Sequence, residues 1–163
     1  MISFGRVNSL LRYSPEDGRF FWRVDRSAGV RAGDEAGTAH HSGYVHLCID
    51  GRSHLAHRIA WLLAVGSAPD AQIDHINGDR SDNRLCNLRR ATHSQNMQNR
   101  RFQANNTTGF TGVVHHKGKF GASIKIKGKR TYLGYFDTAE EAGAAYLVAS
   151  REHHGEFARA NRP

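Results

Sequence analysis

The sequence predicts an α+β fold that is divided into two small domains. Short strand patterns bounded by turn residues alternate with helical stretches along the 163 residues. The polar segment 103–108 has no apolar periodicity and is typical of a linker. We therefore expect a first domain over residues 1–102 and a second domain over residues 109–163.

The opening residues predict a short helix followed by a turn and a strand. We expect the helix near residues 5–12, the turn at 15–18, where the sequence reads Pro-Glu-Asp-Gly, and the strand through 20–22. Residues 28–39 are rich in Gly and Ala. That composition predicts a loop.

The next stretch predicts a hairpin that leads into a helix. Strand-forming residues 44–49 run into Asp50-Gly51, a dipeptide that tolerates the positive φ angles of a type I′ turn, and residues 52–55 form the returning strand. A helix is then expected over residues 56–65, ended by Gly66.

Residues 70–100 are the most polar part of the chain. Near its end, Thr92 and Gln95 have the spacing of a capping box, in which each side chain bonds to the backbone of the other residue. A helix should therefore begin after Thr92 and carry Asn96 and Arg100.

The second domain is expected to be a three-stranded antiparallel sheet packed on one helix. Strands are predicted near residues 112–116, 119–127 and 130–136, and a helix over 138–154. The middle strand alternates apolar residues with Gly, Ser and Lys, so one face should pack on the helix and the other should be basic.

The charge balance favours an anionic partner. Lys and Arg number 23 against 15 Asp and Glu, a formal net charge of +8, which attracts a phosphate backbone without selecting a base sequence. Ribosomal and RNA-binding proteins share this property. We favour nucleic acid over membrane surfaces or acidic proteins, because the sequence has no long basic amphipathic helix.

The remaining composition predicts a cytoplasmic protein with no membrane association. The first eleven residues lack the apolar core of a signal peptide, and the longest apolar run, 59–65, is too short to span a bilayer. Cys48 and Cys86 are far apart in the sequence and match no disulfide or zinc pattern, so we expect both to be buried apolar residues.

A polar cluster in residues 74–96 carries residue types suited to phosphodiester hydrolysis. That reaction needs a base to take a proton from water and a cation to stabilise charge on the phosphate. His75 can be the base, because imidazole titrates near neutral pH. Asp74 and Asn96 offer hard oxygens to one divalent ion, Mg²⁺ or Mn²⁺. Asn87 can tie the intervening loop to the backbone and so orient His75.

The run Asp-His-x-Asn-Gly-Asp, then Asn-Arg-x-x-Asn-Leu-Arg, then Asn resembles the ββα-metal motif of His-Asn-His (HNH) endonucleases, in particular the phage and intron-encoded homing branch. Residues 56–61 also resemble the preceding helix of this branch. The resemblance implies a ββα-metal nuclease domain, with His75 as general base, Asp74 and Asn96 as metal ligands, and Asn87 as a structural residue.

Five other histidines are interpreted as surface or core residues. Their spacing has neither a cysteine partner nor a helical pair with a known metal-binding role. They are His40, His41, His46, His54 and His57.

Residues 105–161 resemble the Apetala-two/ethylene-response-factor DNA-binding domain, through Thr-Gly-Val-Val at 111–114, Gly-Lys-Phe at 118–120 and the segment 132–142. In that family a three-stranded sheet enters the major groove. Several recognition positions differ here from the usual Arg, Glu or Trp, so the plant base preference is not carried over. The positions that match the family's DNA-contacting residues are Thr111, Val114, His116, Ser123, Lys125, Arg130, Tyr132 and Tyr135. Arg100, on the helix expected after Thr92, is a further expected DNA contact.

Together these features predict a monomeric, metal-dependent endonuclease of double-stranded DNA, from a phage or mobile element and acting in the cytoplasm of a bacterial host. Nicking of one strand and cleavage of both strands stay open, as does a homing role. The alternatives are a DNA-binding regulator that carries an inactive nuclease fold, and an RNA-binding protein.

Overall fold

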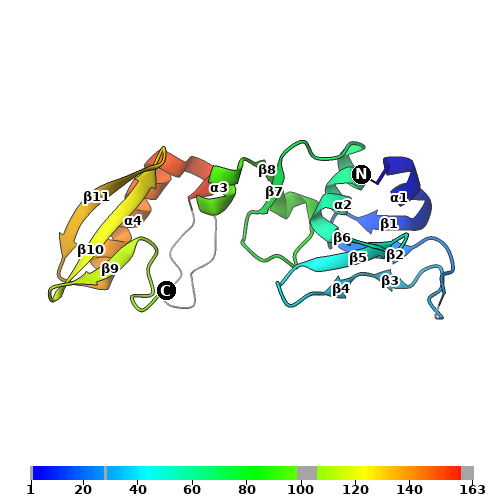
Figure 1. The fold of residues 1–163 in the computed structure, drawn as a ribbon, viewed down its shortest axis with the longest axis horizontal. Coiled ribbons are helices and arrows are strands. Elements are labelled where there is room, and N and C mark those ends of the chain that lie inside the picture. The colour runs from blue at the N-terminus through cyan, green and yellow to red at the C-terminus, as the bar shows by residue number, and fades with distance from the viewer. Residues whose placement is uncertain (1, 28, 99–105, 159–163) are drawn as a thin grey trace. The chain divides into compact units, whose positions relative to one another are not determined.

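The computed structural model describes residues 2–27, 29–98 and 106–158 (Figure 1). It has a mixed α/β fold built on small antiparallel sheets. The chain divides into two compact units, Met1–His93 and Ser94–Pro163. Part of the predicted linker, residues 103–105, lies outside the described residues, so its extent stays a prediction.

The described part of the first unit contains three small sheets with strand orders β1-β2-β3, β4-β5-β6 and β7-β8. The helix α1 comes first, and α2 lies between the second and third sheets in the sequence. The elements are α1 (Phe4–Leu10), β1 (Leu11–Ser14), β2 (Arg19–Trp22), β3 (Glu35–Ala36), β4 (Thr38–Ala39), β5 (Val45–Ile49), β6 (Arg52–Leu55), α2 (Ala56–Val65), β7 (Gln72–His75), a 3-10 helix (Leu85–Asn87) and β8 (Leu88–Ala91).

The predicted hairpin and the helix after it are confirmed. Strands β5 and β6 pair antiparallel around Asp50 and Gly51, whose φ angles of 50° and 72° are those of a type I′ turn. Helix α2 ends at Gly66 in the left-handed conformation, with φ of 83°.

Two expectations for the first 39 residues need correction. The short helix expected near residues 5–12 is present as α1, but it ends at Leu10, because the next residues form β1 and pair with β2. Residues 28–39 are not only a loop: Ala36 pairs with Phe20 and is 5% exposed, while Gly37, with φ of 122°, separates β3 from β4. Such two-residue strands depend on partner strands distant in sequence, which the Gly- and Ala-rich composition does not reveal.

One apolar core joins the elements of the first unit. Helix α2 packs on α1 and on β1, β5 and β6, and β7 and β8 each contribute one apolar side chain to the same core. The buried members are Val7, Leu10, Leu11, Phe20, Ala36, Leu47, Ile49, Ala56, Ile59, Ala60, Leu62, Ile73 and Leu88. Cys48 and Cys86 are both exposed, so the expectation that they are buried was wrong.

The second unit has the sheet-on-helix arrangement expected for it. Strands β9 (Val113–His116), β10 (Lys119–Ile126) and β11 (Lys129–Phe136) form an antiparallel sheet of order β11-β10-β9, followed by α4 (Ala139–His154) and a 3-10 helix (Gly155–Phe157) (Figure 1). A capping box between Thr138 and Glu141 starts α4.

The apolar face of this sheet packs on α4. Ala122 packs with Val113 and Ala142, and Ile124 packs with Tyr146 and Ala149. The small alanines let the helix lie close to the strands.

Over the described residues, no helix has the length and apolar composition needed to cross a bilayer.

Gly112 is a point where this close packing can be tested. It has φ of +72°, and a Cβ built there would lie 2.3 Å from Cδ2 of Tyr146 and 2.5 Å from the carbonyl oxygen of Ser123. Gly112→Ala should lower the free energy of unfolding of the second unit by about 1–3 kcal/mol beyond the backbone strain. Hydrogen exchange of peptides from β9 to β11 would measure this loss of stability.

Gly128→Ala is the matched control, because Gly128 has φ of +84° but no atom lies within 4 Å of a Cβ built there. Both variants carry the strain of positive φ, and only Gly112→Ala adds the collision. Equal protection of the sheet amides in the two variants would contradict this packing.

Candidate active site

Strands β7 and β8 place Asp74 and His75 inside the first unit. Ile73 pairs with Arg90, Asp74 with Arg89, and His75 with Leu88. Ile73 and Leu88 anchor the two strands in the apolar core. The adjacent polar residues are buried with them, since Asp74 is 5% and His75 4% exposed. A carboxylate and an imidazole are therefore both buried at the end of β7, on two consecutive residues of the strand.

Arg89 neutralises the buried carboxylate of Asp74. Its Nε and one terminal nitrogen lie 2.9 Å and 2.8 Å from the same oxygen, Oδ2. The two side chains are 11% and 6% exposed. Removing one member of a buried ion pair leaves an uncompensated charge and typically costs about 3–5 kcal/mol. Arg89 therefore fixes the charge and the orientation of Asp74.

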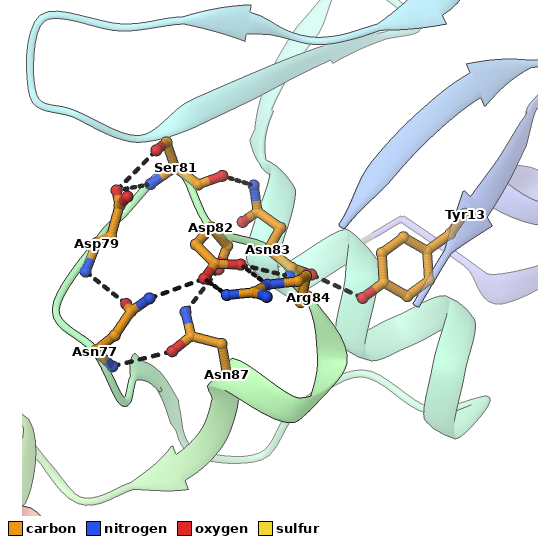
Figure 2. A network of polar contacts seen from close by, with 8 residues as sticks. All are labelled: Tyr13, Asn77, Asp79, Ser81, Asp82, Asn83, Arg84 and Asn87. Atoms are coloured by element: carbon orange, nitrogen blue, oxygen red, sulfur yellow. Dashed lines mark hydrogen bonds and ion pairs between the residues drawn. The ribbon is translucent and has the colours of Figure 1, made fainter. Parts of the chain in front are cut away.

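Asn87 closes the loop that connects the two strands (Figure 2). Its side-chain oxygen accepts from the backbone N–H of Asn77 at 3.0 Å, and its amide nitrogen donates to the backbone carbonyl of Asp82 at 2.8 Å. Its own carbonyl accepts from the N–H of Ile76 at 2.9 Å. These bonds bind the loop directly after His75 to the start of β8. That Asn87 thereby orients His75 for catalysis stays a prediction.

Asp82 is the centre of the same polar network (Figure 2). Its Oδ2 accepts from the terminal guanidinium nitrogen of Arg84 at 2.6 Å and from the amide of Asn77 at 2.8 Å. Its Oδ1 accepts from Nε of Arg84 at 2.8 Å. Hydrogen bonding to Arg84 is the main reason that the pKa of Asp82 is lowered to about 2. The ionised carboxylate therefore stabilises the folded loop.

The N-terminal hairpin of β1 and β2 contacts the loop between β7 and β8. The hydroxyl of Tyr13 donates to the carbonyl of Asn83 at 2.7 Å (Figure 2), and the N–H of Leu85 donates to the carbonyl of Pro15 at 3.0 Å. Gly18, with φ of +75°, lies so close that an added Cβ would be 2.5 Å from the backbone nitrogen of Arg84. The turn at 15–18 is thus packed against the loop.

The rings of His57 and Tyr44 lie close to the ring of His75. The ring of His57, on α2, meets the ring of His75 edge to face, with centroids 5.0 Å apart and planes at 80°. Tyr44 lies 5.3 Å from His57 and 5.9 Å from His75 between ring centroids. Burial lowers the pKa of His75 below its ordinary value, although Asn83 and the nearby carboxylates oppose the shift. His75 is therefore neutral at pH 7 and able to accept a proton.

The donor chemistry at this site fits a hard divalent cation. Asp74 offers carboxylate oxygens, and the amide oxygen expected from Asn96 is of the same hard class. No group of three His, Cys, Asp or Glu side chains suited to a metal occurs within the described ranges. Water molecules and phosphate oxygens of a substrate would therefore have to complete the coordination of an ion held by the Asp74 carboxylate.

Asn96 lies on the helix α3 (His93–Gln98), which begins directly after Thr92 as predicted. From Ser94 onward the chain belongs to the second unit, so a shared ion between Asn96 and Asp74 stays a prediction, as does the capping box of Thr92 and Gln95. Arg100, an expected DNA contact, lies outside the described residues.

Most of the expected DNA contacts lie on the sheet face opposite α4. Ser123 pairs with Tyr132 and Lys125 with Arg130, so these four side chains share one side of β10 and β11. On the same face, the ring of His116 stacks on Tyr135 with centroids 4.9 Å apart. Tyr132 is 71% and Val114 60% exposed. Thr111 precedes β9 and is half-buried.

Three residues near the candidate site were not singled out by the sequence. Arg89 was part of the quoted motif, but its contact with Asp74 follows from the register of β7 and β8. Asp82 resembles an ordinary turn residue until the four hydrogen bonds that its carboxylate accepts are seen. His57 was interpreted as a surface or core residue, and it is buried beside His75. No sequence spacing connects α2 with β7, so this neighbour required the tertiary structure.

The network around Asp82 predicts a pH-dependent stability. Asp82→Asn should destabilise the first unit by about 1–2 kcal/mol at pH 7, since the folded pKa near 2 lies below the ordinary value of about 3.9. This contribution is complete above pH 4 to 5 and is lost as the pH falls toward 2. Urea unfolding followed by the fluorescence of Trp22 and Trp61 would measure it between pH 3 and 7.

Asp50→Asn is the control for that experiment, because Asp50 pairs with Arg6 at the surface and both side chains are about half exposed. Solvent screens such a pair, so its loss should have a smaller effect. A difference between Asp82→Asn and wild type that stays constant from pH 7 to pH 3 would contradict the assigned role of the carboxylate.

Comparison with known proteins assigns the region that holds this site. Residues 54–98 match a protein family described as HNH endonuclease. Protein 3.8 of Escherichia phage T7 is 32% identical over 106 residues, which cover 63% of this chain and 87% of that protein. An uncharacterized HNH endonuclease of Acanthamoeba polyphaga mimivirus is 31% identical over 122 residues, which cover 74% of this chain and 64% of that protein. The chain therefore belongs to the family of Protein 3.8, and it carries an HNH endonuclease domain at residues 54–98.

Proposed function

We propose that this protein is a metal-dependent endonuclease that hydrolyses phosphodiester bonds in double-stranded DNA. The observation that carries the proposal is the buried pair of Asp74 and His75 at the end of β7, inside the segment that matches HNH endonucleases. Such endonucleases generally depend on a metal ion, and Mg²⁺ or Mn²⁺ suits the oxygen donors expected here.

In this proposal His75 is the general base. Its buried imidazole is neutral, so it can take a proton from the water that attacks phosphorus. Asp74, oriented by Arg89, and Asn96 would hold the divalent ion. When bound, the ion would stabilise negative charge on the phosphate and on the leaving oxygen. Asn87 keeps the loop after His75 in place through its two backbone hydrogen bonds.

The second unit would hold the DNA. The formal charge of +8 favours a phosphate backbone, and the exposed face with Lys125, Arg130 and Tyr132 offers both cations and an aromatic ring. From the resemblance to the Apetala-two domain, we propose that this face enters the major groove. Lys and Arg at such positions more often hold phosphates than read bases, so this face fixes position more than sequence.

A DNA-binding regulator with an inactive nuclease fold is the second candidate function. The observation in its favour is that both contacting nitrogens of Arg89 lie on Oδ2 of Asp74, one of the two expected metal ligands. A guanidinium on that carboxylate supplies the countercharge that a metal ion would otherwise provide. Metal-dependent cleavage of DNA would separate the two functions.

Cleavage of supercoiled plasmid tests the nuclease proposal. With Mg²⁺ or Mn²⁺ the protein should convert supercoiled plasmid to the nicked form, since we propose a monomer with one active site per chain, and EDTA should stop the reaction. Linear product at early times would instead indicate cleavage of both strands by a transient dimer. His75→Ala should lower the rate by about 10²–10⁴-fold, the usual contribution of a general base.

His41→Ala is the matched control, because His41 is exposed and outside the candidate site. Its rate should equal that of wild type. Asn96→Ala should raise the Mg²⁺ concentration needed for half-maximal cleavage while DNA binding persists. DNA binding without any cleavage would favour the regulator, and cleavage that persists in His75→Ala would remove His75 as the base.

Salt-dependent binding tests the role of the sheet. Lys125→Ala combined with Arg130→Ala should weaken binding to duplex DNA about equally for different sequences, and should reduce the slope of log affinity against log salt by about 2. Fluorescence anisotropy at several salt concentrations would measure this. Arg151→Ala, on the exposed part of α4, is the charge-matched control and should change the affinity less. Preference for RNA at matched salt would favour the RNA-binding alternative.

A further inference from the structure

A second histidine lies beside the proposed base. His57, the second residue of α2, is 5% exposed, and its ring meets that of His75 edge to face at 5.0 Å between centroids. Both residues belong to the first unit and to the segment that matches HNH endonucleases. The two imidazoles are brought together by the packing of α2 on the strands, not by their spacing in the sequence.

The buried nitrogen of His57 has no partner in the described part of the protein. Its Nδ1 is inaccessible to solvent and makes no hydrogen bond. A polar atom in this position lowers stability, so each such atom needs an explanation. Burial also lowers the pKa of His57 to about 3, so the ring is neutral at pH 7. A neutral imidazole has one N–H and one lone pair to offer.

A purely structural role does not explain why this residue is a histidine. The space around it is aromatic, because Tyr44 lies 5.3 Å from His57 and 5.9 Å from His75, and Arg80 covers Tyr44 at 4.7 Å. A phenylalanine would fill such a space without burying an unbonded nitrogen. The imidazole is therefore expected to form a hydrogen bond in another state of the protein.

We propose that His57 is a positioning residue for His75. Without substrate the two rings meet edge to face, and when DNA binds they move together so that Nδ1 of His57 forms a hydrogen bond with His75. Catalytic hydrogen bonds are often long or poorly aligned in unliganded structures and shorten in the substrate complex. The bond would fix His75 in the one tautomer whose free nitrogen can accept a proton from water. This inference rests on the proposed nuclease function.

Cleavage by His57→Phe tests the inference. Phenylalanine keeps a flat ring but removes both nitrogens, so the variant should melt at a temperature equal to or above that of wild type. At saturating DNA its single-turnover rate should be lower by about 10–100-fold, with an unchanged half-saturating DNA concentration. His57→Ala should lose stability as well as rate. His54→Phe, on the adjacent strand β6, is the control and should cleave as wild type does.

A wild-type rate in His57→Phe would overturn the proposal, because the ring shape alone would then suffice. A change confined to the half-saturating DNA concentration would also overturn the proposal, since His57 would then contact DNA and not position His75. Equal rate loss in His54→Phe would do the same.

The tautomer of His75 provides a readout that does not require cleavage. Long-range ¹H–¹⁵N spectra of histidine-labelled protein with a DNA duplex in EDTA should show one tautomer of His75 in wild type and a mixture in His57→Phe. The same tautomer ratio in both proteins would overturn the inference. If wild type cleaves no DNA under any condition, the proposed function fails, and the spectra still decide whether His57 orients His75.

Discussion

The first unit depends on the hydrogen bonds that a buried polar loop makes with itself. Asp74, His75 and Asn87 are each at most 6% exposed, and each unpaired buried polar group would cost about 1–3 kcal/mol. Asn87 meets this requirement by joining the two ends of the loop, and Asp82 by gathering Asn77 and Arg84 around one carboxylate. A loop bonded in this way has few alternative conformations. The proposed function uses that restriction to orient His75.

The apolar core and the polar loop support each other. Ile73 and Leu88 place the two strands on the core, so the residue after Ile73 is buried and needs a countercharge from Arg89. Tyr13 and Gly18 join the N-terminal hairpin to the same loop. The N-terminal elements are therefore part of the scaffold of the candidate site, although they carry none of its proposed catalytic groups.

Local signals in the sequence predicted much of the fold. The Asp50-Gly51 turn, the glycine after α2 and the alternation along β10 each determine structure within a few residues, and each prediction was confirmed. The missed features depend on partners distant in sequence. The short strands β3 and β4 exist because β2 and β5 pair with them, and Arg89 meets Asp74 because the register aligns them. His57 reaches His75 only after α2 has packed.

Asp74 shows how one residue can serve both stability and the proposed chemistry. A buried carboxylate without a countercharge would be strongly destabilising, so a site that waits for a metal ion needs a resident cation. Arg89 fills that need, and its two contacting nitrogens both fall on Oδ2. In a nuclease Arg89 would preorganise Asp74 before an ion binds, while in a regulator it would replace the ion altogether. The same ion pair therefore serves either function, and the metal dependence of cleavage distinguishes them.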